Sequence, residues 1–193
     1  SRYLTLNLRE SNDIRNQPEA LRERLNEDGF LFIRDFHDRN EVLNVRRDIL
    51  QIMAAAGELD PAAPLMDGFI NPALPTQAGV STKGRENLKT DSLKRLLYGL
   101  RPTNFFREFF ATDAKPYQFQ WLRAGGHGAG STIHADTVYM GRGTKRLCTI
   151  WTPLGDIPPE EHAEDLHRVI EAHTVGPVDC FGTSGGAVNL LAL

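Results

Sequence analysis

The chain has few of the features that assign a protein to a specialised class. It contains no internal repeat and no apolar run near the roughly 18 residues that a membrane-spanning helix needs. Its net charge is only −3 over 193 residues, so no excess of basic charge favours nucleic acid as a partner. These absences predict a globular protein that binds neither membranes nor nucleic acid, and the length suits one domain over residues 1–193.

Cysteine is also scarce. The two cysteines, Cys148 and Cys180, have no spacing typical of a metal site or a disulfide framework. We expect both to be reduced thiols with a structural role, because a free cysteine usually behaves as a small buried apolar residue. The first residues lack the apolar segment of a signal peptide. Together these features predict a cytoplasmic protein.

Helical patterns occupy much of the first 110 residues. Pro18–Asp28 has two leucines four residues apart and is followed by Gly29, which should end the helix. A longer apolar pattern of helical period runs from a capping Asn40 to Gly57. A further helix is expected from Asp91 until Pro102 interrupts it, and the short helix after this proline carries an aromatic cluster that should pack in the core: Phe105, Phe106, Phe109 and Phe110.

Strand patterns lie mainly in the second half of the chain. Aromatic and β-branched content predicts strands at Phe30–Phe36, Tyr117–Arg123 and Arg146–Pro153, and another around residue 134. Residues 58–90 are rich in proline, glycine and polar residues and are expected to form a loop region over the surface or at a pocket mouth. Helices followed by strands are typical of an α+β fold.

The most informative motif is His134-Ala135-Asp136. Side chains two residues apart point to the same side of a β-strand, so this imidazole and this carboxylate can bind one metal ion without distorting the backbone. His-x-Asp supplies two of the three ligands in the 2-His-1-carboxylate site of non-haem Fe(II) enzymes. Taken alone, the pair also fits a surface strand with two polar residues pointing outward.

The sequence around this motif resembles the phytanoyl-CoA dioxygenase family of Fe(II)/2-oxoglutarate oxygenases. The resemblance covers roughly residues 20–158. It is carried by the run from His134 to Pro158, by Gln-Trp-Leu-Arg-Ala-Gly-Gly before it, and by Asp-Gly-Phe-Leu-Phe-Ile-Arg-Asp-Phe near the N-terminus. It implies a double-stranded β-helix (a cupin-like jelly roll) with the N-terminal helices packed on one sheet.

The resemblance also implies a set of site residues and cofactors. Fe(II) would be bound by His134, Asp136 and a distal histidine, and 2-oxoglutarate would bind beside it, in contact with Gln120 and Trp151. Tyr139 would line the pocket wall. Gln118 faces the same side of its strand as Gln120 and remains an alternative to it. The substrate would be a small organic molecule; Lys145 and Arg146 would contact it if it is acidic, although both also suit a solvated turn.

The chain departs from the family pattern after Pro158. Three histidines follow Asp136 in that part of the chain, namely His162, His167 and His173, and of these His173 alone has strand-like neighbours. No Arg or Lys follows Arg168, so the usual partner of the 2-oxoglutarate carboxylate is missing, as is the family's Gly-Ser-His turn. Either the chain is a truncated or divergent form with an incomplete jelly roll, or it is part of a longer protein.

Three functional interpretations therefore stay open. The first is an Fe(II)/2-oxoglutarate-dependent dioxygenase. The second is a catalytically inactive family member that serves as a binding or regulatory module, and the third is a cupin-like isomerase with other metal ligands. An incomplete sheet would expose an unpaired edge, which favours association into a homodimer.

Overall fold

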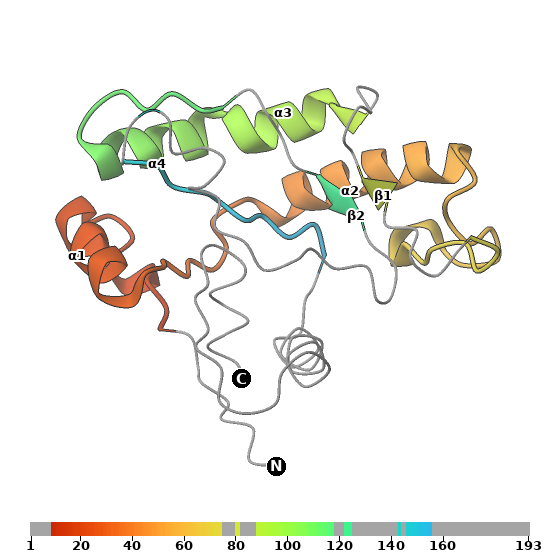
Figure 1. Ribbon diagram of the computed structural model, residues 1–193, viewed down its shortest axis with the longest axis horizontal. Coiled ribbons are helices and arrows are strands. Elements are labelled where there is room, and N and C mark those ends of the chain that lie inside the picture. Colours follow the sequence, from red (N-terminus) through yellow and green to blue (C-terminus); the bar gives the residue numbers. More distant parts are fainter. Residues whose placement is uncertain are drawn as a thin grey trace, which may run out of the picture. The chain divides into compact units, whose positions relative to one another are not determined.

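The structure is a computed structural model that describes residues 9–74, 80–81, 88–117, 122–124, 143 and 146–155. The chain forms two compact units, and Figure 1 labels the helices and strands that they contain. One comprises residues 1–34 and 132–193, and the other comprises residues 35–131. The single domain over residues 1–193 stays a prediction.

The first unit contains a short 3-10 helix, η1 (Asn12–Ile14), and the helix α1 (Pro18–Asp28). Pro18 stands in the first turn, where its fixed φ suits a helix and its missing N–H costs nothing. Gly29 ends α1 with a positive φ of 75°, and its N–H donates to the Leu25 carbonyl at 2.9 Å. A left-handed residue at this position is easiest for glycine. The predicted helix and its end at Gly29 are confirmed.

The strand predicted at Phe30–Phe36 is wrong. One parallel bridge joins Phe32 to Glu10, where the Ser11 N–H donates to the Phe32 carbonyl at 2.8 Å. The extended backbone then stops, because the Arg34 N–H donates to the Asn12 side chain and Asp35 adopts a positive φ of 51°. Despite its β propensity, the segment therefore forms one isolated bridge followed by a turn, and no ladder of paired residues.

The second unit contains three helices in its described part: α2 (Arg39–Ala55), α3 (Asp91–Tyr98) and α4 (Leu100–Phe110). The N-terminal cap of α2 is Asp38, not Asn40 as predicted, since the Asp38 carboxylate accepts from the backbone N–H groups of Asn40 and Glu41. The residue before Asn40 is already helical, so Asn40 is too far along to cap the helix.

The helix break near residue 100 lies earlier than predicted. It falls at Gly99, where a Cβ atom would stand 2.3 Å from the Arg95 carbonyl oxygen. Pro102 then lies in the first turn of α4, where the helix does not need its N–H. Pro102 therefore helps to start α4 rather than to end α3.

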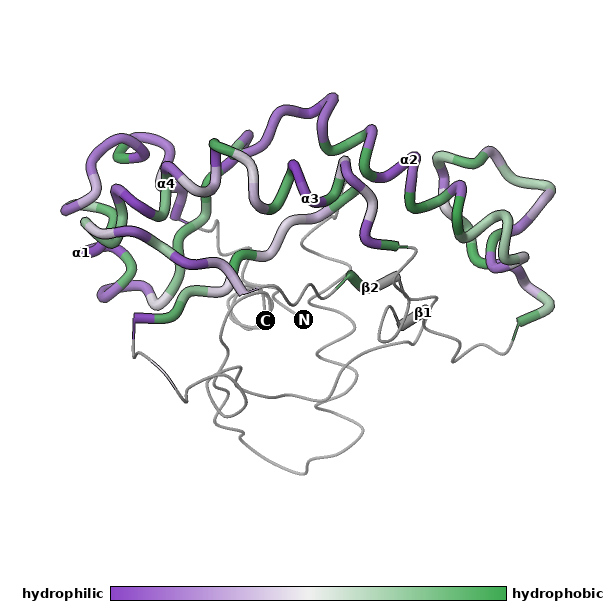
Figure 2. Tube along the Cα trace, turned by 90° about the horizontal axis from the view of Figure 1, so that it is seen from above, coloured by the Kyte–Doolittle hydropathy of each residue, from purple (hydrophilic) through white to green (hydrophobic). Residues whose placement is uncertain are grey.

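The core of this unit is aliphatic. Helix α2 packs against α3 and against the short 3-10 helix η2 (Leu65–Asp67), and α3 packs against α4. Figure 2 shows apolar and polar residues alternating along α2, as expected of a helix with one buried face. The Ser92 hydroxyl of α3 donates to the Asp48 carboxylate of α2. The buried apolar residues of the unit are Val45, Ile49, Leu50, Met53, Leu59, Leu88, Leu93, Leu96 and Phe109.

Strands are short in the described residues. Strand β1 (Val80–Ser81) pairs antiparallel with β2 (Arg123–Ala124), Val80 opposite Ala124 and Ser81 opposite Arg123. No strand is assigned within residues 146–155, where one was expected. The other predicted strands lie largely outside the described residues, so the α+β jelly roll stays a prediction. Within the described ranges, no helix is long and apolar enough to cross a membrane.

Candidate functional site

The predicted metal ligands His134 and Asp136 lie outside the described residues, and so do Gln120 and Tyr139. The same holds for Gln118 and for the three candidates for the distal ligand, His162, His167 and His173. Where the structure is described, no three His, Cys, Asp or Glu residues lie close enough to hold a metal ion. The candidate iron site therefore depends on the sequence motif.

One predicted site residue, Trp151, lies in the described segment 146–155, and half of it is exposed. Arg146 in the same segment is exposed, which suits either a solvated turn or contact with an acidic substrate. Cys148 is a free, partly buried thiol, as predicted, and burial raises its pKa. A protonated thiol is neither a nucleophile nor a metal ligand, so a structural role fits Cys148. Cys180 lies outside the described residues.

The second unit has an apolar hollow of about 230 Å³ beside the C-terminal end of α2. It lies in the first part of the region expected to form a pocket mouth. Phe69, which is 62% exposed, contributes to its wall, and Asp60 is the charged residue among its described lining. The lining residues are Ala54, Leu59, Asp60, Pro61, Ala63, Pro64, Leu65, Gly68 and Phe69.

The wall of this hollow is fixed by backbone hydrogen bonds. The Arg46 guanidinium of α2 donates to the Met66 carbonyl at 2.8 and 3.0 Å and to the Asp67 carbonyl at 3.1 Å. The Asp60 N–H donates to the Phe69 carbonyl at 2.8 Å, next to an antiparallel bridge between Leu59 and Ile70. The hollow is therefore preformed, and its apolar lining suits an apolar group rather than a reaction centre.

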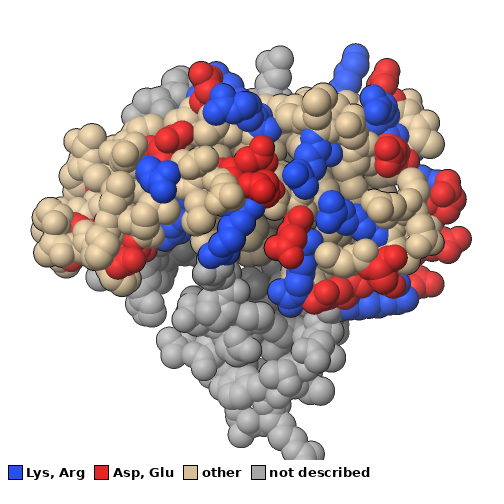
Figure 3. Space-filling model, turned by 180° about the vertical axis from the view of Figure 1, so that it is seen from behind, with Lys and Arg blue, Asp and Glu red and all other residues tan. Residues whose placement is uncertain are grey.

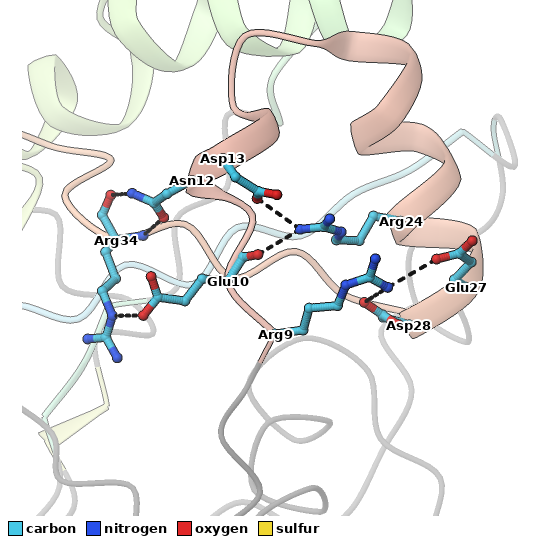
Figure 4. A network of polar contacts seen from close by, with 8 residues as sticks. All are labelled: Arg9, Glu10, Asn12, Asp13, Arg24, Glu27, Asp28 and Arg34. Carbon is cyan, nitrogen blue, oxygen red and sulfur yellow. Dashed lines mark hydrogen bonds and ion pairs between the residues drawn. The ribbon is translucent and has the colours of Figure 1, made fainter.

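The densest cluster of described charges lies in the first unit (Figure 4). Arg24 donates to the Glu10 carbonyl at 2.6 Å and to the Asp13 carboxylate at 3.1 Å. The hydrogen bond from Arg24 to the Asp13 carboxylate lowers the pKa of Asp13. Arg34 pairs with the Glu10 side chain.

Arg9 of the same cluster lies 3.1 Å from Glu27 and 3.5 Å from Asp28. Each arginine of this cluster thus has a carboxylate partner. This network of ion pairs and hydrogen bonds connects residues 9–34 with one another.

One titratable residue, His37, has an environment that no sequence pattern indicated. Its ring packs edge-on against Phe36, with centroids 4.9 Å apart. Burial lowers the pKa of His37, and the Arg101 cation lowers it further, while Glu41 raises it. The Arg101 cation that acts on His37 lies 64 residues further along the chain. No local sequence pattern indicates such a long-range interaction.

The described surface seen in Figure 3 carries basic and acidic side chains interspersed with one another rather than gathered by sign. Comparisons with protein-family models, curated proteins and solved structures give no match. The resemblance to the phytanoyl-CoA dioxygenase family therefore stays a prediction that depends on the motif residues.

Proposed function

We propose that this protein is a non-haem oxygenase that uses Fe(II) and 2-oxoglutarate to oxidise a small organic substrate. The observation that carries the proposal is the motif His134-Ala135-Asp136, followed by Tyr139 and Trp151 at the offsets of the family it resembles. The donor chemistry supports it, because a neutral imidazole and a carboxylate are ligands that Fe(II) accepts in such sites.

The roles of the residues follow from their chemistry. His134 and Asp136 would bind the metal from one side of their strand, leaving other positions open. Gln120 would donate hydrogen bonds to 2-oxoglutarate, and Trp151 and Tyr139 would wall the pocket and exclude water. When bound, Fe(II) and 2-oxoglutarate would supply the oxidation of a substrate C–H bond to C–OH by molecular oxygen, with 2-oxoglutarate converted to succinate and carbon dioxide.

The partner proposed is a small molecule in the cytoplasm, not nucleic acid or a membrane. The interspersed surface charges and the net charge of −3 support this, since neither provides a basic face for a polyanion. A homodimer remains part of the proposal, because a second copy would cover any unpaired edge of the sheet.

The test is an anaerobic titration of the purified protein with Fe(II) and 2-oxoglutarate, followed by a succinate assay in air. We expect a weak visible charge-transfer band and succinate formation that needs both additions. Asp136→Ala should abolish the band and reduce succinate formation to background, because one remaining ligand holds Fe(II) poorly. Asp113→Ala, which removes an exposed carboxylate outside the motif, is the matched control and should keep both signals.

A catalytically inactive binding module is the second candidate, favoured by the absence of any Arg or Lys after Arg168. A folded protein that gives neither band nor succinate would contradict the oxygenase and support this candidate. Isothermal titration of 2-oxoglutarate without metal then separates the two, since a binding module keeps its ligand affinity in Asp136→Ala.

A further inference from the structure

The corner before α2, formed by Phe36, His37 and Asp38, is attached to α4 through aromatic rings. Phe36 contacts His37 on one side and Phe105 of α4 on the other, with both ring pairs edge-to-face at 4.9 and 5.1 Å between centroids. Phe105 stacks on Phe109 at 6.0 Å, and Phe109 is 5% exposed. The corner before α2 is thus connected to the core through this row of rings.

Two polar contacts define the same corner. The Arg101 guanidinium of α4 donates to the Phe36 carbonyl at 3.3 Å. The Asp38 carboxylate accepts from the backbone N–H groups of Asn40 and Glu41 at 2.9 and 3.1 Å and so caps α2. His37 therefore lies in the chain between Phe36, whose carbonyl Arg101 binds, and Asp38, the N-terminal cap of α2, next to the positive end of the helix dipole.

This placement favours the neutral imidazole. Among the charged groups that act on the ring, Arg101 from α4 opposes protonation and Glu41 from α2 favours it. Arg101 and Glu41 are both exposed, so solvent screens both charges, whereas the His37 ring is partly buried, and this burial is the largest cause of the lowered pKa. Burial and Arg101 together outweigh Glu41, and the pKa of His37 lies below its ordinary value of 6.5.

We propose that Phe36, His37, Phe105 and Arg101 form a pH-sensitive latch, which holds the corner before α2 against α4 while His37 is neutral and loosens when His37 is protonated. Protonation places a second cation beside Arg101 and at the positive end of α2. Both repulsions are relieved when the His37 ring leaves Phe36 for solvent. The latch does not depend on the proposed oxygenase activity.

The direction of the effect follows from proton linkage. The closed latch binds a proton less readily than the open one, so it is fully favoured above pH 6.5 and is weakened as pH falls from 6.5 to the lower pKa of closed His37. Within that window, the ratio of open to closed latch should rise about tenfold per pH unit. Below the window the ratio stays constant.

The first experiment is hydrogen exchange by mass spectrometry on the full chain at pH 7.5 and 5.5, corrected for intrinsic exchange. Peptides covering residues 36–45 should lose protection at pH 5.5, while peptides covering residues 91–98 of α3 keep theirs. His37→Gln, which keeps a polar side chain but cannot titrate here, should show equal protection of residues 36–45 at both pH values. Equal acid sensitivity in His37→Gln and the original protein would overturn the latch.

If His37→Gln does not fold, variants of the charged residues Arg101 and Glu41 test the proposal instead. Proton NMR of the histidine rings should show His37 titrating at a higher pH in Arg101→Gln and at a lower pH in Glu41→Gln. Arg101→Lys retains the cation without the planar guanidinium and should leave the His37 titration near its original pH. Titration of His37 at or above 6.5 in the original protein, or shifts of the same sign in both Gln variants, would refute the proposal.

Discussion

Two regions of the molecule are stabilised by different kinds of contact. One is the segment of residues 9–34, and the other is the set of helices α2, α3 and α4. In the described part of the first unit up to residue 34, the buried residues are Leu21 and Ser11, and ion pairs and hydrogen bonds provide most of the connections (Figure 4). The helices of the second unit instead bury a row of aliphatic side chains. Apolar burial scales with area and is nearly independent of salt, whereas ion pairs are screened. The two regions should therefore respond differently to truncation and to ionic strength.

The largest effect is expected in the aliphatic core. Met53 on α2 is 1% exposed, and Met53→Ala leaves a cavity that the packed neighbours fill only in part. We expect the free energy of unfolding to fall by about 2–5 kcal/mol. Urea denaturation followed by far-UV circular dichroism measures it, and the loss should be the same at low and high salt.

Gln51→Ala is the matched control for this variant, because Gln51 lies on the same helix and is exposed. It should change the free energy of unfolding little. A loss as large as that of Met53→Ala would mean that α2 packs on another face than the one described.

The sequence could predict this core because helical period is a local property. Val45, Ile49 and Met53 recur at helical spacing and are buried as that spacing requires. Phe109 of the aromatic cluster is buried as well, while Phe105 is partly exposed. Periodicity thus identifies the face of a helix that is buried, and it does so without knowledge of the partner.

Contacts between distant segments could not be predicted in this way. The strand expected at Phe30–Phe36 depended on a pairing partner, and the chain provides one bridge to Glu10 instead. The pairing of His134 with Asp136 rests on strand alternation alone, so the sequence can name two ligands on one strand. The third ligand would come from a remote strand, and no local period specifies which histidine arrives there.

A smaller effect is expected from the polar network of residues 9–34. The Arg24 side chain is 11% exposed and donates to the Glu10 carbonyl and the Asp13 carboxylate. Arg24→Gln removes the buried guanidinium, and we expect a loss of about 1.5–2 kcal/mol from its charged hydrogen bond to the backbone. In contrast to Met53→Ala, the loss should shrink as salt is raised.

Arg22→Gln serves as the control on the same helix, since Arg22 pairs with an exposed glutamate, Glu19, at 2.7 Å. It should leave the free energy of unfolding almost unchanged. Hydrogen exchange of the α1 amides, measured in both variants, shows whether the loss lies within residues 9–34. Protection of these amides should fall in Arg24→Gln and stay unchanged in Arg22→Gln. A salt-independent loss in Arg24→Gln would contradict the contrast between the two regions.

The smallest effect concerns a polar contact inside the aliphatic region. Asp38→Ala removes the carboxylate that accepts from two backbone N–H groups at the start of α2, and we expect a loss of about 1 kcal/mol. Asn40→Ala is the matched variant, because Asn40 is the cap that the sequence pattern favoured, yet the structure places it within the helix. It should be neutral or slightly stabilising, since alanine is the better helix former. The reverse order in urea denaturation would restore Asn40 as the cap and move the start of α2 along the chain. That result would also undermine the latch, because His37 would then no longer lie next to the positive end of the helix.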